Sequence, residues 1–110
     1  MLNGVERIAV ERKRQIEKEG WDAEHDDENS DGQLADAAVC YALHNYSGDF
    51  EITCKNNHYF IDFWDLLWPW DDDYWKPSHQ KIRNLEKAGA LIAAEIDRLL
   101  RADVINDSDT

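Results

Sequence analysis

The chain has 110 residues with a formal net charge of −12, and 33% of its residues are charged against 43% hydrophobic. These values predict one globular domain over residues 1–102, followed by a flexible acidic tail over residues 103–110. The excess of acid excludes direct binding to nucleic acid or anionic membrane, and it favours basic proteins, metal ions or small ligands held in a pocket.

The first predicted helix runs from Val5 to Glu19, and Gly20 ends it in the usual position after the last turn. Arg12 and Gln15 lie in or beside the apolar stripe of this helix, where leucine is expected. They are either polar side chains at the edge of the stripe or partly buried groups with a polar role. The stripe itself comprises Val5, Ile8, Ala9, Arg12 and Ile16.

An acidic loop and a second helix follow. Residues Gly20–Gly32 hold six acids and one histidine without periodicity, which is typical of a loop. The second helix is predicted over Gln33–Tyr46 and is rich in alanine. Its smooth stripe allows another helix to approach closely, and it comprises Leu34, Ala37, Ala38, Tyr41 and Ala42.

The middle of the chain predicts a hairpin and then a structured loop. Residues Phe50–Trp64 alternate apolar and polar side chains around a turn at "KNN", which predicts a β-hairpin packed on the helices. Residues Asp65–Pro77 are broken by Pro69 and Pro77, so a loop is expected, with one helical turn around Asp65–Leu67.

The last helix is predicted from its cap Ser78 to Arg101. Gly89 in its middle costs up to about 1 kcal/mol against alanine, which a close crossing with the second helix would explain. The predicted fold is therefore α+β and mainly α, with three helices, one inserted β-hairpin and long ordered loops. The apolar stripe of this helix comprises Ile82, Leu85, Gly89, Ile92, Ile96 and Leu99.

The two cysteines, Cys40 and Cys54, are too few for a disulfide framework. Each is followed four residues later by a histidine, His44 and His58, so a tetrahedral zinc set is formally complete. The separations differ from those of common zinc modules, and a buried structural cysteine is the ordinary alternative. The start of the chain lacks the apolar segment of a signal peptide, and no apolar run reaches the roughly 18 residues of a membrane span, so a cytoplasmic location is expected.

Carboxylates cluster at "EHDDE", Glu24–Glu28. A divalent metal at Asp26 and Asp27 is one interpretation, because hard cations prefer carboxylate oxygens, and a solvated acidic loop is the plain one. No other cofactor is indicated. A metal-dependent nucleotide hydrolase would use Asp26, Asp27, Asp36 and Glu95, although the paired acidic helix motifs of such enzymes are missing.

Four of the five tryptophans lie between residues 62 and 77, interleaved with aspartates. Their rings offer stacking surfaces, while Lys76 and the start of the last helix offer positive potential, a combination that suits a nucleotide-like ligand. The alternative is that the rings cover the core and the aspartates keep the loop soluble.

The stretches "ERKRQIEKEGW", "EHDDE", "LADAAVCYA", "WPW", "YWKP" and "NLEKAGALIAAEIDRL" resemble a family of small hypothetical proteins of bacteriophages and prophages. The resemblance covers Glu11–Tyr41 and Trp68–Leu99, and it implies a phage protein in a bacterial host cell. The helix leading into "EGW", then "DD" and a late lysine, is similar to the repeat domain of ryanodine receptors, which is associated with adenine-nucleotide-type ligands. The phage resemblance implies a ligand site at Arg12, Gln15, Trp21, His25, Asp26, Asp27, Trp68, Trp70, Trp75 and Lys76.

The leading hypothesis is a non-catalytic phage accessory protein, with a counter-defence role as one form, that binds a nucleotide-like small ligand. In it Trp68, Trp70 and Trp75 stack, Lys76 and Arg12 meet phosphate, and His25 and Asp26 contact base or ribose. The alternatives are an acidic mimic of nucleic acid that inhibits a basic host protein such as a defence nuclease, and the metal-dependent hydrolase. Exposed tryptophans also leave a homo-oligomer open.

Overall fold

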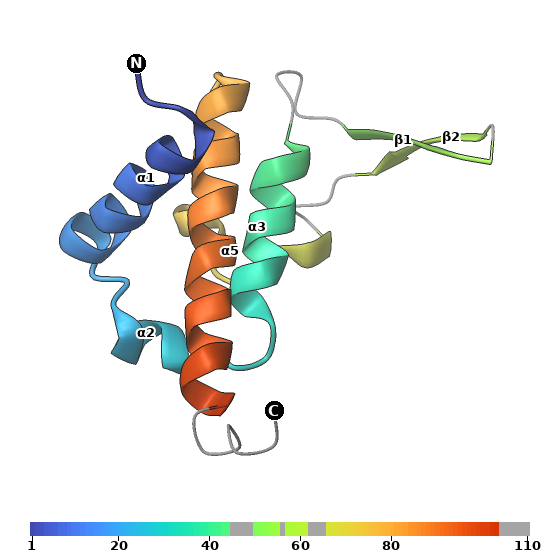
Figure 1. The fold of residues 1–110 in the computed structure, drawn as a ribbon. Coiled ribbons are helices and arrows are strands. Elements are labelled where there is room, and N and C mark those ends of the chain that lie inside the picture. Colours follow the sequence, from blue (N-terminus) through green and yellow to red (C-terminus); the bar gives the residue numbers. More distant parts are fainter. Residues whose placement is uncertain (45–49, 56, 62–65, 104–110) are drawn as a thin grey trace.

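The computed structural model describes residues 1–44, 50–55, 57–61 and 66–103, with 50–54 and 58–61 described as backbone. Helix α5 lies between α1 and α3, and α2 sits beside the C-terminal half of α5 (Figure 1). No helix among the described residues is long and apolar enough to cross a membrane. The elements are α1 (Gly4–Glu19), α2 (Ala23–Asp27), α3 (Gln33–Leu43), β1 (Phe50–Cys54), β2 (Asn57–Ile61), the 3-10 helix η1 (Asp72–Tyr74) and α5 (Lys81–Asp103).

The predicted α+β class is wrong, whereas the mainly-α part of the prediction is confirmed, since helices make up most of the described chain. The segments β1 and β2 pair only with each other, from Phe50 opposite Ile61 to Cys54 opposite Asn57, and they project away from the helices (Figure 1). The hydrophobic core of the described residues is made by helices, with aromatic rings packed against it. The expected hairpin packed on the helices is therefore not part of this core.

Four helices are present in the described residues where three were expected. The additional one is α2, within the segment predicted to be a loop. Asp22 caps it by accepting a hydrogen bond from the His25 backbone N–H at 3.0 Å. A helix of five residues is too short to leave an apolar period in the sequence, which explains why it was missed.

The core is the contact between α3 and α5. Leu34, Ala37 and Ala38 of α3 meet Ala88 and Leu91 of α5, and all five are at most 2% exposed. The small side chains let the two helix backbones approach closely, as the alanine-rich stripe of α3 predicted. Helix α3 is shorter than expected, since His44 forms its C-cap, and residues 45 and 46 lie outside the described part of the chain.

The apolar stripe of α5 does not make this contact. Ile82, Leu85, Ile92, Ile96 and Leu99 remain 46–61% exposed, while the buried face of the helix is offset around its axis. Its buried residues are Asn84, Ala88, Ala90, Leu91 and Ala94.

Helix α1 is also rotated relative to the prediction. Its buried residues are Glu11 and Gln15, whereas Val5 is 79% and Ile16 is 41% exposed. The helix therefore docks on α5 mainly through polar groups, and its predicted apolar stripe lies largely outside the core.

Gly89 marks a close crossing, although its partner is α1 and not α3. A Cβ atom at Gly89 would lie 2.5 Å from Ile8 Cδ1 and 2.7 Å from Ile8 Cγ1. Glycine therefore leaves space for the Ile8 side chain. The packing that this space permits outweighs the loss of about 1 kcal/mol in helix propensity relative to alanine.

The close crossing predicts that Gly89→Ala changes the free energy of unfolding in opposite directions when Ile8 is present and when it is truncated. Gly89→Ala is expected to lower the free energy of unfolding by about 1 kcal/mol, because overpacking against Ile8 exceeds the gain in helix propensity. In an Ile8→Ala background the same substitution should raise stability by up to about 1 kcal/mol. Urea unfolding of the four proteins of this double-mutant cycle measures both values, and equal effects in the two backgrounds would contradict the crossing.

Candidate functional site

Two segments far apart in the sequence meet beside the end of α1. The Trp70 indole Nε1 donates to Asn29 Oδ1 at 3.0 Å. This bond connects the loop over residues 66–77, which we call the aromatic loop, to the segment after α2. The Trp21 ring lies parallel to the His25 ring, with 5.8 Å between centroids and 7° between planes. Trp70 lies 6.2 Å from Trp21. These rings build one wall of an open cleft.

The cleft has a volume of about 660 Å³. This lies within the range of about 300–1,000 Å³ that small-molecule sites occupy. Aromatic rings and acidic side chains alternate around it, so the cleft offers flat apolar surfaces and hydrogen-bond acceptors. The residues that line it are Glu19, Trp21, His25, Glu28, Asn29, Pro69, Trp70, Asp71 and Tyr74.

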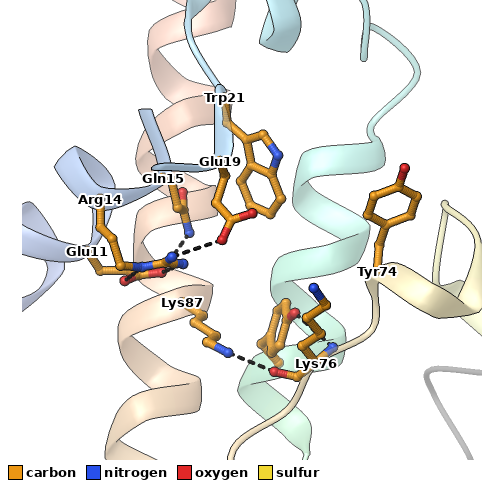
Figure 2. A pocket seen from close by; sticks show the side chains of 9 residues that line it. Glu11, Arg14, Gln15, Glu19, Trp21, Tyr74, Lys76 and Lys87 are labelled. Atoms are coloured by element: carbon orange, nitrogen blue, oxygen red, sulfur yellow. Dashed lines mark hydrogen bonds and ion pairs between the residues drawn. The ribbon is translucent and has the colours of Figure 1, made fainter. Parts of the chain in front are cut away.

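A smaller, charged pocket of about 50 Å³ adjoins the cleft. The two hollows share Glu19, Trp21 and Tyr74. In the view of Figure 2, Trp21 and Tyr74 lie above this pocket and Lys76 and Lys87 lie below it. Three basic side chains line it, two lysines and Arg14, so positive charge lies directly beside the aromatic wall.

Glu11 is the buried centre of the charged pocket. Its carboxylate, in a residue 2% exposed, accepts hydrogen bonds from Arg14 at 2.8 and 3.0 Å and pairs with Arg83 at 2.7 Å. Burial raises the pKa of Glu11, but the hydrogen bonds from Arg14 and Arg83 outweigh this effect and hold the pKa below its ordinary value. The Glu11 charge is thus neutralised locally. Gln15 Nε2 donates to it at 3.3 Å, while the buried Gln15 Oε1 has no partner among the described residues.

The two lysines of the pocket differ in their freedom. Lys87 Nζ donates to the Lys76 carbonyl at 2.7 Å and lies 5.4 Å above the Tyr41 ring. Burial, reinforced by the nearby Arg83, lowers the pKa of Lys87. The Lys76 backbone is fixed by that bond and by its own N–H, which donates to Tyr41 Oη at 3.4 Å. Its side chain is exposed and has no hydrogen-bond or ion-pair partner within the described ranges.

Arg12 and Asp26, both expected at a ligand, instead hold the fold together. Arg12 Nη2 lies 2.6 Å from Asp26 Oδ2, and Arg12 Nη1 donates to the Trp21 carbonyl at 3.0 Å. Asp26 is fully buried and also contacts His25 Nδ1 at 3.1 Å. Neither side chain lines the cleft or the pocket. Asp27 is exposed and pairs with Arg101 at 2.7 Å, which attaches α2 to α5.

The tryptophans of the aromatic loop all pack against the core, as the alternative in which rings cover the interior expected. Trp68 and Trp75 lie 4.9 Å apart and contact Tyr41. Trp70 packs against the core and also lines the cleft, together with Trp21 from the other segment. Of the three rings predicted to stack on a ligand, Trp70 lines the cleft, whereas Trp68 and Trp75 do not.

Among the residues whose side chains are described, no three carboxylate, histidine or cysteine groups are placed to hold a metal ion. Asp26 and Asp27 each pair with an arginine, and Glu95 pairs with Arg98 at 2.6 Å. The predicted zinc set lies outside the described side chains, because those of Cys54 and His58 are not described.

Tyr74, Lys87 and Glu11 belong to the two hollows and were not predicted. Glu11 carried one available signal, since it lies one turn before Gln15 on the same face of the first helix. Tyr74 carried another, since it is one of the rings of residues 62–77 that offer stacking surfaces. Lys87 carried none, because the meeting of α1, α5 and the aromatic loop is visible only in the fold. Comparison with protein-family models, curated proteins and solved structures finds no match to this chain.

Two neighbouring aspartates test the structural role of α2. Asp26→Asn should lower the free energy of unfolding by about 3–5 kcal/mol, because it leaves the Arg12 charge without its buried partner. Asp27→Asn, which breaks a pair exposed to solvent, should cost less than about 1 kcal/mol. Chemical denaturation of both variants measures the difference, and similar losses would contradict the buried clamp.

The Glu11 cluster predicts a stability that depends on acid pH. Because the pKa of Glu11 is lower in the folded state, its contribution is present above the ordinary value of 4.5 and is lost as the pH falls through the folded value. Glu11→Gln should therefore be less stable than the wild type by about 2 kcal/mol at neutral pH, with the difference shrinking as the pH falls below the ordinary value of 4.5. Glu17→Gln, at an exposed side chain 3.9 Å from Lys13, is the control and should show a small difference at every pH.

Proposed function

We propose that the cleft binds a nucleotide-like small ligand without catalysis. The observation that carries this proposal is the direct contact between the aromatic cleft and the pocket that holds Lys76 and Lys87. A planar ring and an attached phosphate need these two environments side by side, within the reach of one small molecule.

The cleft supplies the surface for the ring. The parallel Trp21 and His25 rings, with Trp70 beside them, present aromatic surface to the hollow. Stacking of a base on an aromatic side chain contributes roughly 1–3 kcal/mol and tolerates any base, since every base has a π face. Exocyclic amino groups would find acceptors in the acidic rim at Glu28 and Asp71.

The adjoining pocket supplies the charge for a phosphate. Arg14 is engaged by Glu11 and by Glu19, the latter at 2.9 Å, and Arg83 pairs with Glu11 at 2.7 Å, so two guanidinium groups balance the two carboxylates. The ammonium groups of Lys76 and Lys87 remain as the positive charge of the pocket. A phosphate between them would replace water with two charge-assisted hydrogen bonds.

The non-catalytic part of the proposal is supported by the pairing of the acidic side chains. Asp26, Asp27 and Glu95, three of the four carboxylates named for the alternative hydrolase, each pair with an arginine. The resemblance to small phage proteins supports an accessory role in an infected host cell, with counter-defence as one form of it.

Matched ligands and matched lysine variants test the proposal. Adenosine and AMP differ by the phosphate alone, and Lys76→Ala should weaken AMP binding about tenfold while leaving adenosine binding unchanged. The backbone bonds of Lys76 survive this substitution, so the fold is kept. Lys13→Ala removes an exposed charge of α1 and should change neither affinity. Calorimetry and tryptophan fluorescence report the binding.

A second variant addresses the aromatic half of the site. Trp21→Leu should weaken adenosine and AMP equally, because it removes a stacking surface that both share. Absence of heat and of fluorescence change with every mono-, di- and cyclic nucleotide at about 1 mM would overturn the proposed ligand class.

A further inference from the structure

A row of aliphatic side chains on α5 stays exposed on both sides of the point where Ile8 of α1 meets Gly89. The stripe keeps five aliphatic side chains 46–61% exposed along one face of the longest helix. Soluble monomers seldom leave a continuous row of this kind in water, and such rows mark interaction surfaces. The members of the row are Ile82, Leu85, Ile92, Ile96 and Leu99.

The exposed stripe of α1 extends this surface. Ile8 and Val5 lie on one face of α1 by their spacing, and Ile16 continues that face. Ile8 sits against Gly89, which is the middle position of the α5 stripe. The two stripes therefore meet at this crossing and form one two-helix face, which we call the α1–α5 face.

The spacing along α5 is that of a helix made to pack against another helix. Its stripe advances by three and four residues in turn, which is the heptad rhythm, with Ile82 and Ile96 at one type of position and Leu85 and Leu99 at the other. The row from Ile82 to Leu99 is about 26 Å long, long enough for several turns of contact. Within the chain α3 packs on a different face of α5 and α1 meets the stripe at Gly89, so the five aliphatic positions of this rhythm stay exposed.

Charge identifies the partner. Ten of the twelve basic residues and eight of the 24 acidic residues lie in α1 and α5, so these helices carry a net +2 and the rest of the chain carries −14. Two copies would repel each other through every other surface, but not through this one. An apolar and nearly neutral face is self-complementary, as a two-fold interface requires.

We propose that the α1–α5 face docks on the same face of a second copy, giving a two-fold dimer with four helices at its interface. Burial of the α5 stripe from both copies would supply the apolar centre of the interface. The ion pairs around it, Arg7 with Glu86 at 2.7 Å and Arg101 with Asp27, would form a polar rim. The cleft and its charged pocket are lined by none of the exposed stripe residues, so the dimer is independent of the proposed ligand.

Analytical ultracentrifugation of the full chain tests the dimer. The wild type should sediment with twice the mass of the 12.8 kDa chain at micromolar concentration. Ile96→Lys should give the monomer mass, because it places a charge within the apolar row. Higher salt should increase the dimer fraction of the wild type, since salt screens the repulsion between two chains of −12.

Val39→Lys is the matched control, because it adds the same charge at an α3 residue that is 40% exposed and lies outside the face. It should leave the dimer intact, and circular dichroism should show that both variants keep the wild-type helix content. A wild type that remains monomeric at about 100-fold higher concentration would overturn the proposal. Equal dissociation of Ile96→Lys and Val39→Lys, or a dimer that survives Ile96→Lys unchanged, would also overturn it.

Discussion

The candidate site depends on one buried ion pair, between Arg12 of α1 and Asp26 of α2. The same guanidinium holds the Trp21 carbonyl and the same carboxylate holds the His25 ring, so one pair positions two members of the aromatic wall. A buried pair of this kind adds little net stability against an apolar alternative, but it fixes geometry. The cleft exists because the chain between α1 and α3 is held at this point, and not because α2 has a strong helical tendency of its own.

Parts of this fold could be predicted from the sequence because neighbouring residues alone determine them. Gly20 has the left-handed backbone that ends α1, and the alanines of α3 form the close contact with α5 that their size allows. The faces that α1 and α5 bury could not be predicted in this way. Periodicity identifies an apolar stripe but not its partner, and both helices turn polar or small residues such as Glu11 and Ala88 toward the core.

The site shows the same division between local and tertiary information. The tryptophans of the aromatic loop are alike in sequence, yet Trp68 and Trp75 cover Tyr41 while Trp70 reaches Asn29. All three pack against the core, and no local rule decides that Trp70 alone of them also lines the cleft. Arg12 attracted a ligand role because a charge in an apolar stripe is unusual. Its true partner, Asp26, became visible only when the chain was folded back on itself.

The mismatch between apolar pattern and burial leaves aliphatic side chains exposed on a chain whose net charge is −12. Helix α5 has three faces: small residues packed on α3, polar groups that bind α1, and the free aliphatic row. Sixteen of the 24 acidic residues lie outside α1 and α5, so in the proposed dimer repulsion between chains would disfavour contact through the other surfaces. The heptad rhythm of the α5 row would then select the arrangement of the two copies. Helix α1 shows the same mismatch, because it buries Glu11 and Gln15 against the rest of the chain while Val5 and Ile16 stay exposed.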